Sequence, residues 1–115
     1  DLLKTAADPT GRRVRGMLHA HGMGRHNAAE IAALGARSID AIATHLGDKP
    51  FFMGAEPTGV DATVFAFAAG ALCPQFETPL RAAAERHENL RCYVARMTGR
   101  FYPEFEDLAG GKAAA

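Results

Sequence analysis

The segment from residue 18 to residue 31, LHAHGMGRHNAAEI, concentrates the side chains of this 115-residue sequence that could do chemistry. It holds three histidines and an arginine close together: His19, His21, Arg25 and His26. Imidazole nitrogens bind metal ions, and an arginine beside free helix amides can bind an anion. We therefore compare three interpretations, namely a metal site, an anion site, and a plain turn between two helices.

The spacing of the histidines argues against a metal site. His19 and His21 are two positions apart, which places them about 200° apart around a helix, whereas two ligands on one helix need a spacing of three or four. His26 could join His21 across the turn, but this does not complete a tetrahedral ligand set. Gly22 and Gly24 suit a helix end followed by a sharp reversal, so we predict a turn and no metal.

An anion site is the second interpretation, because Arg25, His26 and the free amides of the following helix could converge on a phosphate or carboxylate. However, Asn27 followed by Glu30 is the pattern of a capping box, which occupies the same amides. We interpret Asn27 and Glu30 as structural capping residues. Arg25 is better explained by pairing with a helix C-terminus or with a carboxylate of another domain.

Hydrophobic periodicity and capping signals predict five helices in this chain, near residues 9–21, 28–46, 60–72, 79–87 and 90–101. No segment shows the alternation of a strand, so the expected class is all-α. Each helix follows a residue that can cap its free amides. These expected caps are Asp8, Asn27, Thr58, Thr78 and Asn89.

The third of these helices is expected to be the central element of the fold. Its sequence from residue 60 to 72, VDATVFAFAAGAL, is apolar on nearly every side, which is typical of a helix surrounded by protein. Thr58 before it and Asp61 near its start have the spacing of a second capping box, and we interpret them as caps rather than as a catalytic pair. Phe51 and Phe52 should anchor the preceding loop to the core.

The charge balance excludes some classes of partner. Lysines and arginines number 13, as do aspartates and glutamates, so no net field attracts nucleic acid or an anionic membrane. We interpret Arg12, Arg13 and Arg15 as a solvated basic face. No apolar run reaches the roughly 20 residues of a membrane span, and a cytoplasmic location is expected. Cys73 and Cys92 lack a metal-binding or redox spacing and are expected to be buried thiols.

Two stretches, LGDKPFFMGAEPTGVDATVFAF and HENLRCYVARM, resemble the all-helical C-terminal domain of glutathione S-transferases. The resemblance covers about residues 12–103, and GMGRH is similar to the bacterial branch related to metaxin and failed-axon-connections proteins. It implies a five-helix bundle around a buried central helix over residues 1–105. Residues 106–115 are expected to be a disordered tail.

The resemblance also implies a function. Glutathione would be a co-substrate of the full-length protein, activated in a thioredoxin-like N-terminal domain outside these residues, so we expect no catalytic residue and no cofactor in this chain. The helical domain would bind a small electrophile, with the first helix and the end of the last lining the pocket, and it would form a homodimer interface. His19, His21, Arg25 and His26 are then candidate substrate contacts. The alternative is a non-catalytic, metaxin-like binding or scaffold module.

Overall fold

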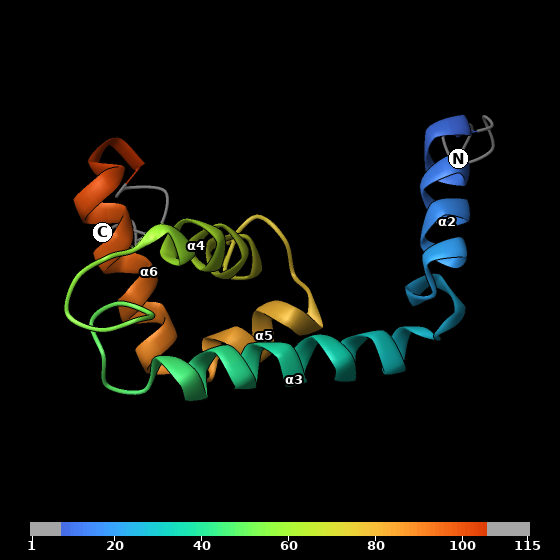
Figure 1. Cartoon of the computed structure of the whole chain (residues 1–115). Coiled ribbons are helices and arrows are strands. Elements are labelled where there is room, and N and C mark those ends of the chain that lie inside the picture. Colours follow the sequence, from blue (N-terminus) through green and yellow to red (C-terminus); the bar gives the residue numbers. More distant parts are fainter. Residues whose placement is uncertain (1–7, 106–115) are drawn as a thin grey trace, which may run out of the picture. The chain divides into compact units, whose positions relative to one another are not determined.

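A computed structural model describes residues 8–105 of the chain, which falls into two compact units, Asp1–Ala33 (unit 1) and Leu34–Ala115 (unit 2). The described part contains five α-helices and no strand, which confirms the all-α class (Figure 1). The single domain expected over residues 1–105 stays a prediction, and the expected tail, 106–115, lies outside the described residues. The elements are α2 (Pro9–His21), the 3₁₀-helix η1 (Met23–Arg25), α3 (Ala28–Leu46), α4 (Gly59–Ala71), α5 (Pro79–Glu85), α6 (Glu88–Phe101) and the 3₁₀-helix η2 (Pro103–Phe105).

Short-range caps begin the helices as the sequence predicts. At α2, the Asp8 carboxylate accepts a hydrogen bond from the Gly11 amide at 2.8 Å, and a proline occupies the first turn. At α5, the Thr78 hydroxyl accepts from the Arg81 amide at 3.1 Å, again with a proline at the first position. Each cap satisfies an amide that has no partner within its own helix.

The expected cap at Asn89 is wrong. The N-cap of α6 is His87, and Asn89 lies inside the first turn of that helix. Its side-chain nitrogen donates instead to two carbonyl oxygens at the end of α3, those of Ala43 at 2.9 Å and Gly47 at 3.1 Å. Asn89 therefore supports the C-terminal end of another helix: it adds a second donor to the Ala43 carbonyl, which already accepts from the Gly47 amide, and donates to the Gly47 carbonyl beyond the helix.

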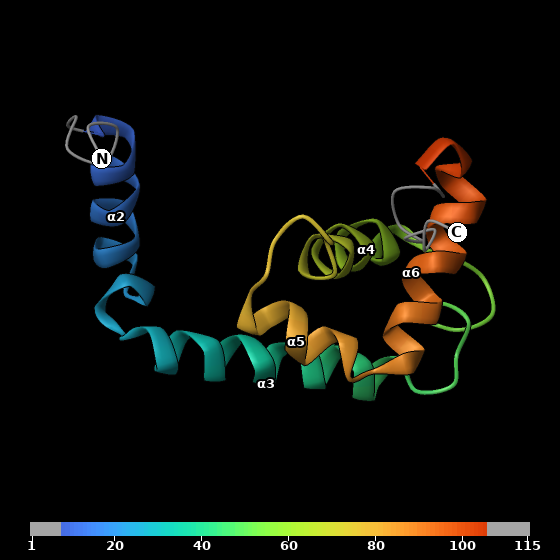
Figure 2. The same ribbon diagram turned by 180° about the vertical axis from the view of Figure 1, so that it is seen from behind.

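The core of unit 2 is built from α3 to α6 and the loop before α4. Small residues let the helices approach closely: a Cβ added at Gly35 of α3 would lie 2.9 Å from Leu80 Cδ1 of α5. Figure 1 shows α5 alongside α3, and Figure 2 shows the same part from behind. The buried core residues are Ile39, Leu46, Phe51, Val64, Ala68, Ala71, Ala83, Ala84, Leu90, Tyr93, Val94 and Met97.

The α4 helix buries one face within unit 2. Val64 and Ala68 are buried, whereas Phe67 is 71% exposed. The apolar sequence of α4 indicated a helix enclosed on nearly every side, but α5 and α6 pack against only one side of it. Phe51 is buried and Phe52 packs against the core, so the predicted anchoring of the loop before α4 is confirmed.

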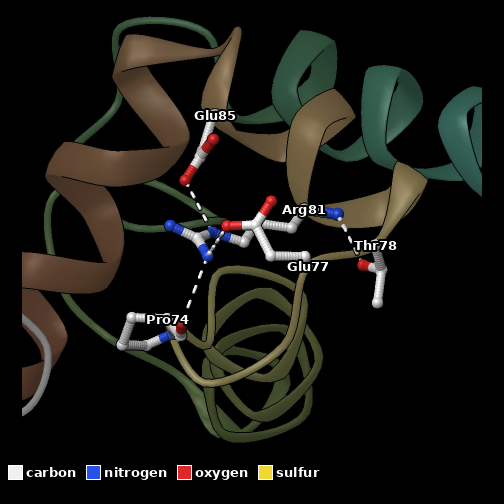
Figure 3. A network of polar contacts seen from close by, with 5 residues as sticks. All are labelled: Pro74, Glu77, Thr78, Arg81 and Glu85. Atoms are coloured by element: carbon white, nitrogen blue, oxygen red, sulfur yellow. Dashed lines mark hydrogen bonds and ion pairs between the residues drawn. The ribbon is translucent and has the colours of Figure 1, made fainter.

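A polar network fixes the connection between α4 and α5 (Figure 3). Its centre is the Arg81 guanidinium, which donates to Glu85 at 2.7 Å, to the Pro74 carbonyl oxygen at 3.2 Å and to Glu77 at 3.3 Å. Glu77 is almost fully exposed, so its pairing adds little stability, whereas the bond to the Pro74 carbonyl holds the loop against α5.

The two cysteines are less buried than their sequence context indicated. Cys73 is partly exposed and Cys92 is exposed. On α6 the buried residues include Leu90, Tyr93 and Val94, and Cys92 falls on the opposite side of the helix. The expectation of a buried thiol is therefore wrong for Cys92.

We predict that Asn89→Asp lowers the free energy of unfolding by about 1 to 3 kcal/mol, because it replaces a donor by a carboxylate that faces two carbonyl oxygens. Urea denaturation at neutral pH measures the change. Gln75→Glu, the same chemical change on an exposed loop, is the matched control and should be nearly neutral. Equal stability of the two variants would contradict the capping role of Asn89.

Candidate functional site

The four candidate residues of unit 1 lie around the end of α2. His19 and His21 occupy its last turn, Arg25 ends η1, His26 follows it, and all four side chains are exposed. The Arg25 Nε donates to the His19 carbonyl oxygen at 2.9 Å, so this arginine pairs with a helix C-terminus, as the sequence indicated. The favourable charge of Arg25 at this helix end is a structural role.

The two glycines of this segment have conformational reasons to be there. Gly22 ends α2 with a φ of 115°, a conformation that residues with a side chain rarely adopt. A Cβ on Gly24 would lie 2.6 Å from the backbone nitrogen of His19, so a side chain there would clash with α2. The interpretation of both glycines as parts of a sharp turn is confirmed.

The predicted capping box at the start of α3 is also present. The Glu30 amide donates to the Asn27 side-chain oxygen, and the Asn27 amide donates to the Glu30 carboxylate, both at 2.9 Å. His26 Nδ1 lies 3.2 Å from the same carboxylate. These hydrogen bonds, first from the Asn27 amide and then from His26, lower the pKa of Glu30. An anion at the start of α3 would have to compete with Glu30.

No group of three His, Cys, Asp or Glu side chains comes together as a potential metal site within residues 8–105. His26 and Glu30 form a pair in this region, and His19 and His21 share the last turn of α2. Over the same residues, no helix is both long enough and apolar enough to cross a membrane.

The Asp61 carboxylate is the buried charged group of unit 2 among the described residues, and Asp61 is 1% exposed. One oxygen accepts from the Thr58 amide at 2.8 Å, and the capping box with Thr58 is present. The Thr58 hydroxyl is 3.4 Å from the same oxygen. The other oxygen accepts from the Phe52 amide and from the Tyr93 hydroxyl, both at 2.9 Å.

Sequence reasoning missed Phe52 and Tyr93 as partners of Asp61. The available signal was the position of Tyr93 on the buried stripe of α6, since a buried tyrosine hydroxyl needs a hydrogen-bond partner. With these donors, a carboxylate that the sequence identifies as a helix cap also joins the loop before α4 to α6.

Burial and hydrogen bonding have opposite effects on the pKa of Asp61, but both raise the pKa of Tyr93. Burial tends to raise the pKa of Asp61, but the bonds from Phe52, Thr58 and Tyr93 together lower it below its usual value. The pKa of Tyr93 is raised, first by burial and then by its bond to the Asp61 carboxylate. Asp61 is therefore ionised and Tyr93 protonated at neutral pH, which fits a structural pair rather than a proton-transfer pair.

A second feature of unit 2 is an aromatic cluster, which we define as Phe65, Tyr102 and Phe105. The rings of Phe65 and Tyr102 are stacked, with centroids 5.6 Å apart and an angle of 11°, and Phe105 lies 6.4 Å from Tyr102. Tyr102 is 43% exposed and Phe105 47% exposed. Nearby in sequence, the Arg100 guanidinium lies over the Phe101 ring at 5.6 Å.

A sequence profile for the glutathione S-transferase C-terminal domain matches residues 35–97, more than half of the 115 residues. The chain belongs to this family. The matched range contains the Asp61 carboxylate and its partners Phe52, Thr58 and Tyr93, and it ends before the exposed part of the aromatic cluster. In this glutathione S-transferase C-terminal domain, the capping pair Thr58 and Asp61 thus lies within the matched range, whereas Asn27 and Glu30 lie before it.

A curated relative supports the same assignment. The domain is 35% identical over 94 residues to "Failed axon connections" of Drosophila melanogaster, which confirms the resemblance to that group. The match covers 79% of this chain but 22% of the relative, so the chain spans about a fifth of the length of that protein. No solved structure matches the chain.

We predict that Asp61→Asn lowers the free energy of unfolding of this glutathione S-transferase C-terminal domain by about 2 to 4 kcal/mol at pH 7, because one acceptor oxygen becomes an amide that faces buried donors. Glu30→Gln alters an exposed capping box of the same type and should cost less stability. Urea unfolding of both variants measures the difference. A smaller loss for Asp61→Asn than for Glu30→Gln would refute the role of burial.

The Asp61→Asn variant and the wild-type protein together test the pH dependence. Because the pKa of Asp61 is lowered in the folded state, its contribution is present above the unfolded pKa of about 3.9 and is lost as the pH falls through the folded pKa. Wild-type stability should therefore fall more steeply below about pH 4 than that of Asp61→Asn. Parallel pH profiles for the two proteins would contradict an ionised Asp61.

Proposed function

We propose that this chain is the helical domain of a glutathione S-transferase-like protein and supplies the surface that binds a small electrophile. Glutathione would be held and activated by a thioredoxin-like partner domain outside these residues. Membership of the family supports the first part of the proposal, and the exposed aromatic cluster at the end of α6 is the observation that supports the second.

The aromatic cluster has the geometry of a platform for a flat ligand. Phe65 and Tyr102 already stack, so an incoming aromatic ring gains contact area from side chains that are held in place. The Tyr102 hydroxyl adds one polar group that can orient a substituent. An electron-poor aromatic electrophile is the ligand class that fits best.

The domain's contribution to catalysis would be positional. In conjugation of a halogenated aromatic electrophile, the glutathione thiolate sulfur forms a bond to the ring carbon, and the carbon–halogen bond breaks with release of halide. The reaction needs both reactants held close together in a suitable orientation. The helical domain would hold the electrophile, and the partner domain would supply the thiolate. We assign no residue of this chain to proton transfer or nucleophilic attack.

His19, His21, Arg25 and His26 stay proposed substrate contacts of unit 1. Arg25 and His26 already bond to the protein itself, whereas the exposed rings of His19 and His21 leave room for a ligand. A homodimer and a cytoplasmic location are further parts of the proposal.

The second candidate function is a non-catalytic, metaxin-like binding or scaffold module. The observation that favours it is that the hydrogen bonds of Asp61 and Tyr93 in unit 2, and of Asn27 and Glu30 in unit 1, hold helix ends and loops. A protein that contains both domains and conjugates no electrophile in the presence of glutathione would favour this candidate over the first.

We predict that the isolated chain binds glutathione no more tightly than the millimolar range, because the proposed thiol site lies in the partner domain. Isothermal titration calorimetry with reduced glutathione tests this, with oxidised glutathione as the control ligand. Micromolar affinity for reduced glutathione would mean that this chain holds its own thiol site, against the proposed division of roles.

We also predict that chlorodinitrobenzene, a flat electron-poor electrophile, shifts the NMR signals of Tyr102 and Phe105 when it is titrated into the isolated chain. Tyr102→Ala should weaken this binding by about 3- to 10-fold through loss of ring stacking. Phe76→Ala removes an exposed ring outside the cluster and is the matched control. Equal effects of the two substitutions would contradict the platform.

A further inference from the structure

The α2 helix carries a local charge that the balanced composition of the whole chain conceals. Arg12, Arg13 and Arg15 lie in its first two turns, and the helix contains no acidic residue. All three are exposed, and none forms an ion pair with another residue in the described range 8–105. The first half of the helix is therefore a concentrated positive surface.

The same helix exposes an apolar stripe. Val14 is 48% exposed, Met17 64% and Leu18 44%, and no residue of α2 is buried. Because successive helical residues are about 100° apart, these three side chains lie within about 100° of one another. The helix is therefore amphipathic, and these three apolar side chains are exposed.

The arginines are placed around this stripe in a definite way. By the same rotation of about 100° per residue, Arg13 borders the stripe on one side and Arg15 on the other, while Arg12 points away from it. Apolar side chains flanked by long cationic ones are typical of helices that lie in a membrane interface, where arginine stems reach past the apolar level to the headgroups.

We propose that α2 binds the surface of a bilayer rich in anionic phospholipid, with Val14, Met17 and Leu18 directed into the interface and the arginines against the headgroups. The charge complementarity supports an anionic surface, and the exposed apolar stripe favours a bilayer over a simple polyanion. The proposal goes beyond the proposed function and uses none of its candidate residues. It replaces the interpretation of the three arginines as a merely solvated face.

Vesicle sedimentation with the full chain tests this inference. Vesicles of phosphatidylcholine with an equal part of phosphatidylglycerol should bind the chain at low salt, and phosphatidylcholine vesicles should not. Arg12→Gln, Arg13→Gln and Arg15→Gln combined should lower the partition coefficient by about 100-fold. The triple lysine variant at these positions keeps the charge and should restore binding.

Removing the charges of Arg37, Arg86 and Arg91 in unit 2 is the matched control and should leave binding unchanged.

A second variant separates the bilayer from a simple polyanion. Met17→Ser with Leu18→Ser should reduce vesicle binding at least tenfold while heparin binding stays the same. Circular dichroism verifies that each variant keeps its helix content. Absence of binding to the anionic vesicles at low salt, or equal loss in the unit 2 control, would overturn the proposal. Full vesicle binding by the serine variant would also overturn it, in favour of a polyanion site.

Discussion

The Asp61 carboxylate joins three parts of unit 2 that are separate in sequence: the loop at Phe52, the start of α4 at Thr58, and α6 at Tyr93. A carboxylate buried without a counter-charge is costly, so it persists only where several donors replace its water. Here two backbone amides and a tyrosine hydroxyl do so. Because those donors come from different segments, satisfying one charge also fixes the directions in which the segments leave the core.

This constraint reaches the aromatic cluster through α4. Asp61 sits in the first turn of that helix, and Phe65 lies one turn further along it. Tyr93 holds the middle of α6, whose end leads to Tyr102 and Phe105. Phe65 thus belongs to α4 and Tyr102 directly follows α6, the two helices that the bond between Asp61 and Tyr93 joins. A polar link of this kind in the core favours one arrangement of the exposed ring surface.

Features whose hydrogen-bond partners lie close together in the sequence can be predicted from it, whereas features whose partners lie far apart cannot. The caps at Asp8, Asn27 and Thr78 bond within three residues, so local pattern alone predicts them. Asn89 has the residue type of a cap, but its bonding partners lie 42 and 46 residues earlier, and only the packing of α6 on α3 selects that role.

The same limit applies to exposure and to the candidate sites. The apolar composition of α4 predicts burial, but which face is buried depends on the helices that pack against it, and Phe67 falls outside that contact. The position of Tyr93 on the apolar face of its helix predicts that it is buried. Its bond to Asp61 joins residues 32 positions apart, and the local pattern does not predict it. The contacts of the histidine segment are local, and there the turn, the capping box and the role of Arg25 follow from the sequence.

The closure of α3 by Asn89 has a consequence for the order in which the chain acquires its structure. Local amides already bond to the carbonyl oxygens of Ala43 and Leu46, but the two Asn89 donors reach the end of α3 only when α6 packs against it. Bringing these segments together requires closing the chain between them, which costs entropy. We therefore expect the last turn of α3 to gain its full set of hydrogen bonds together with the first turn of α6.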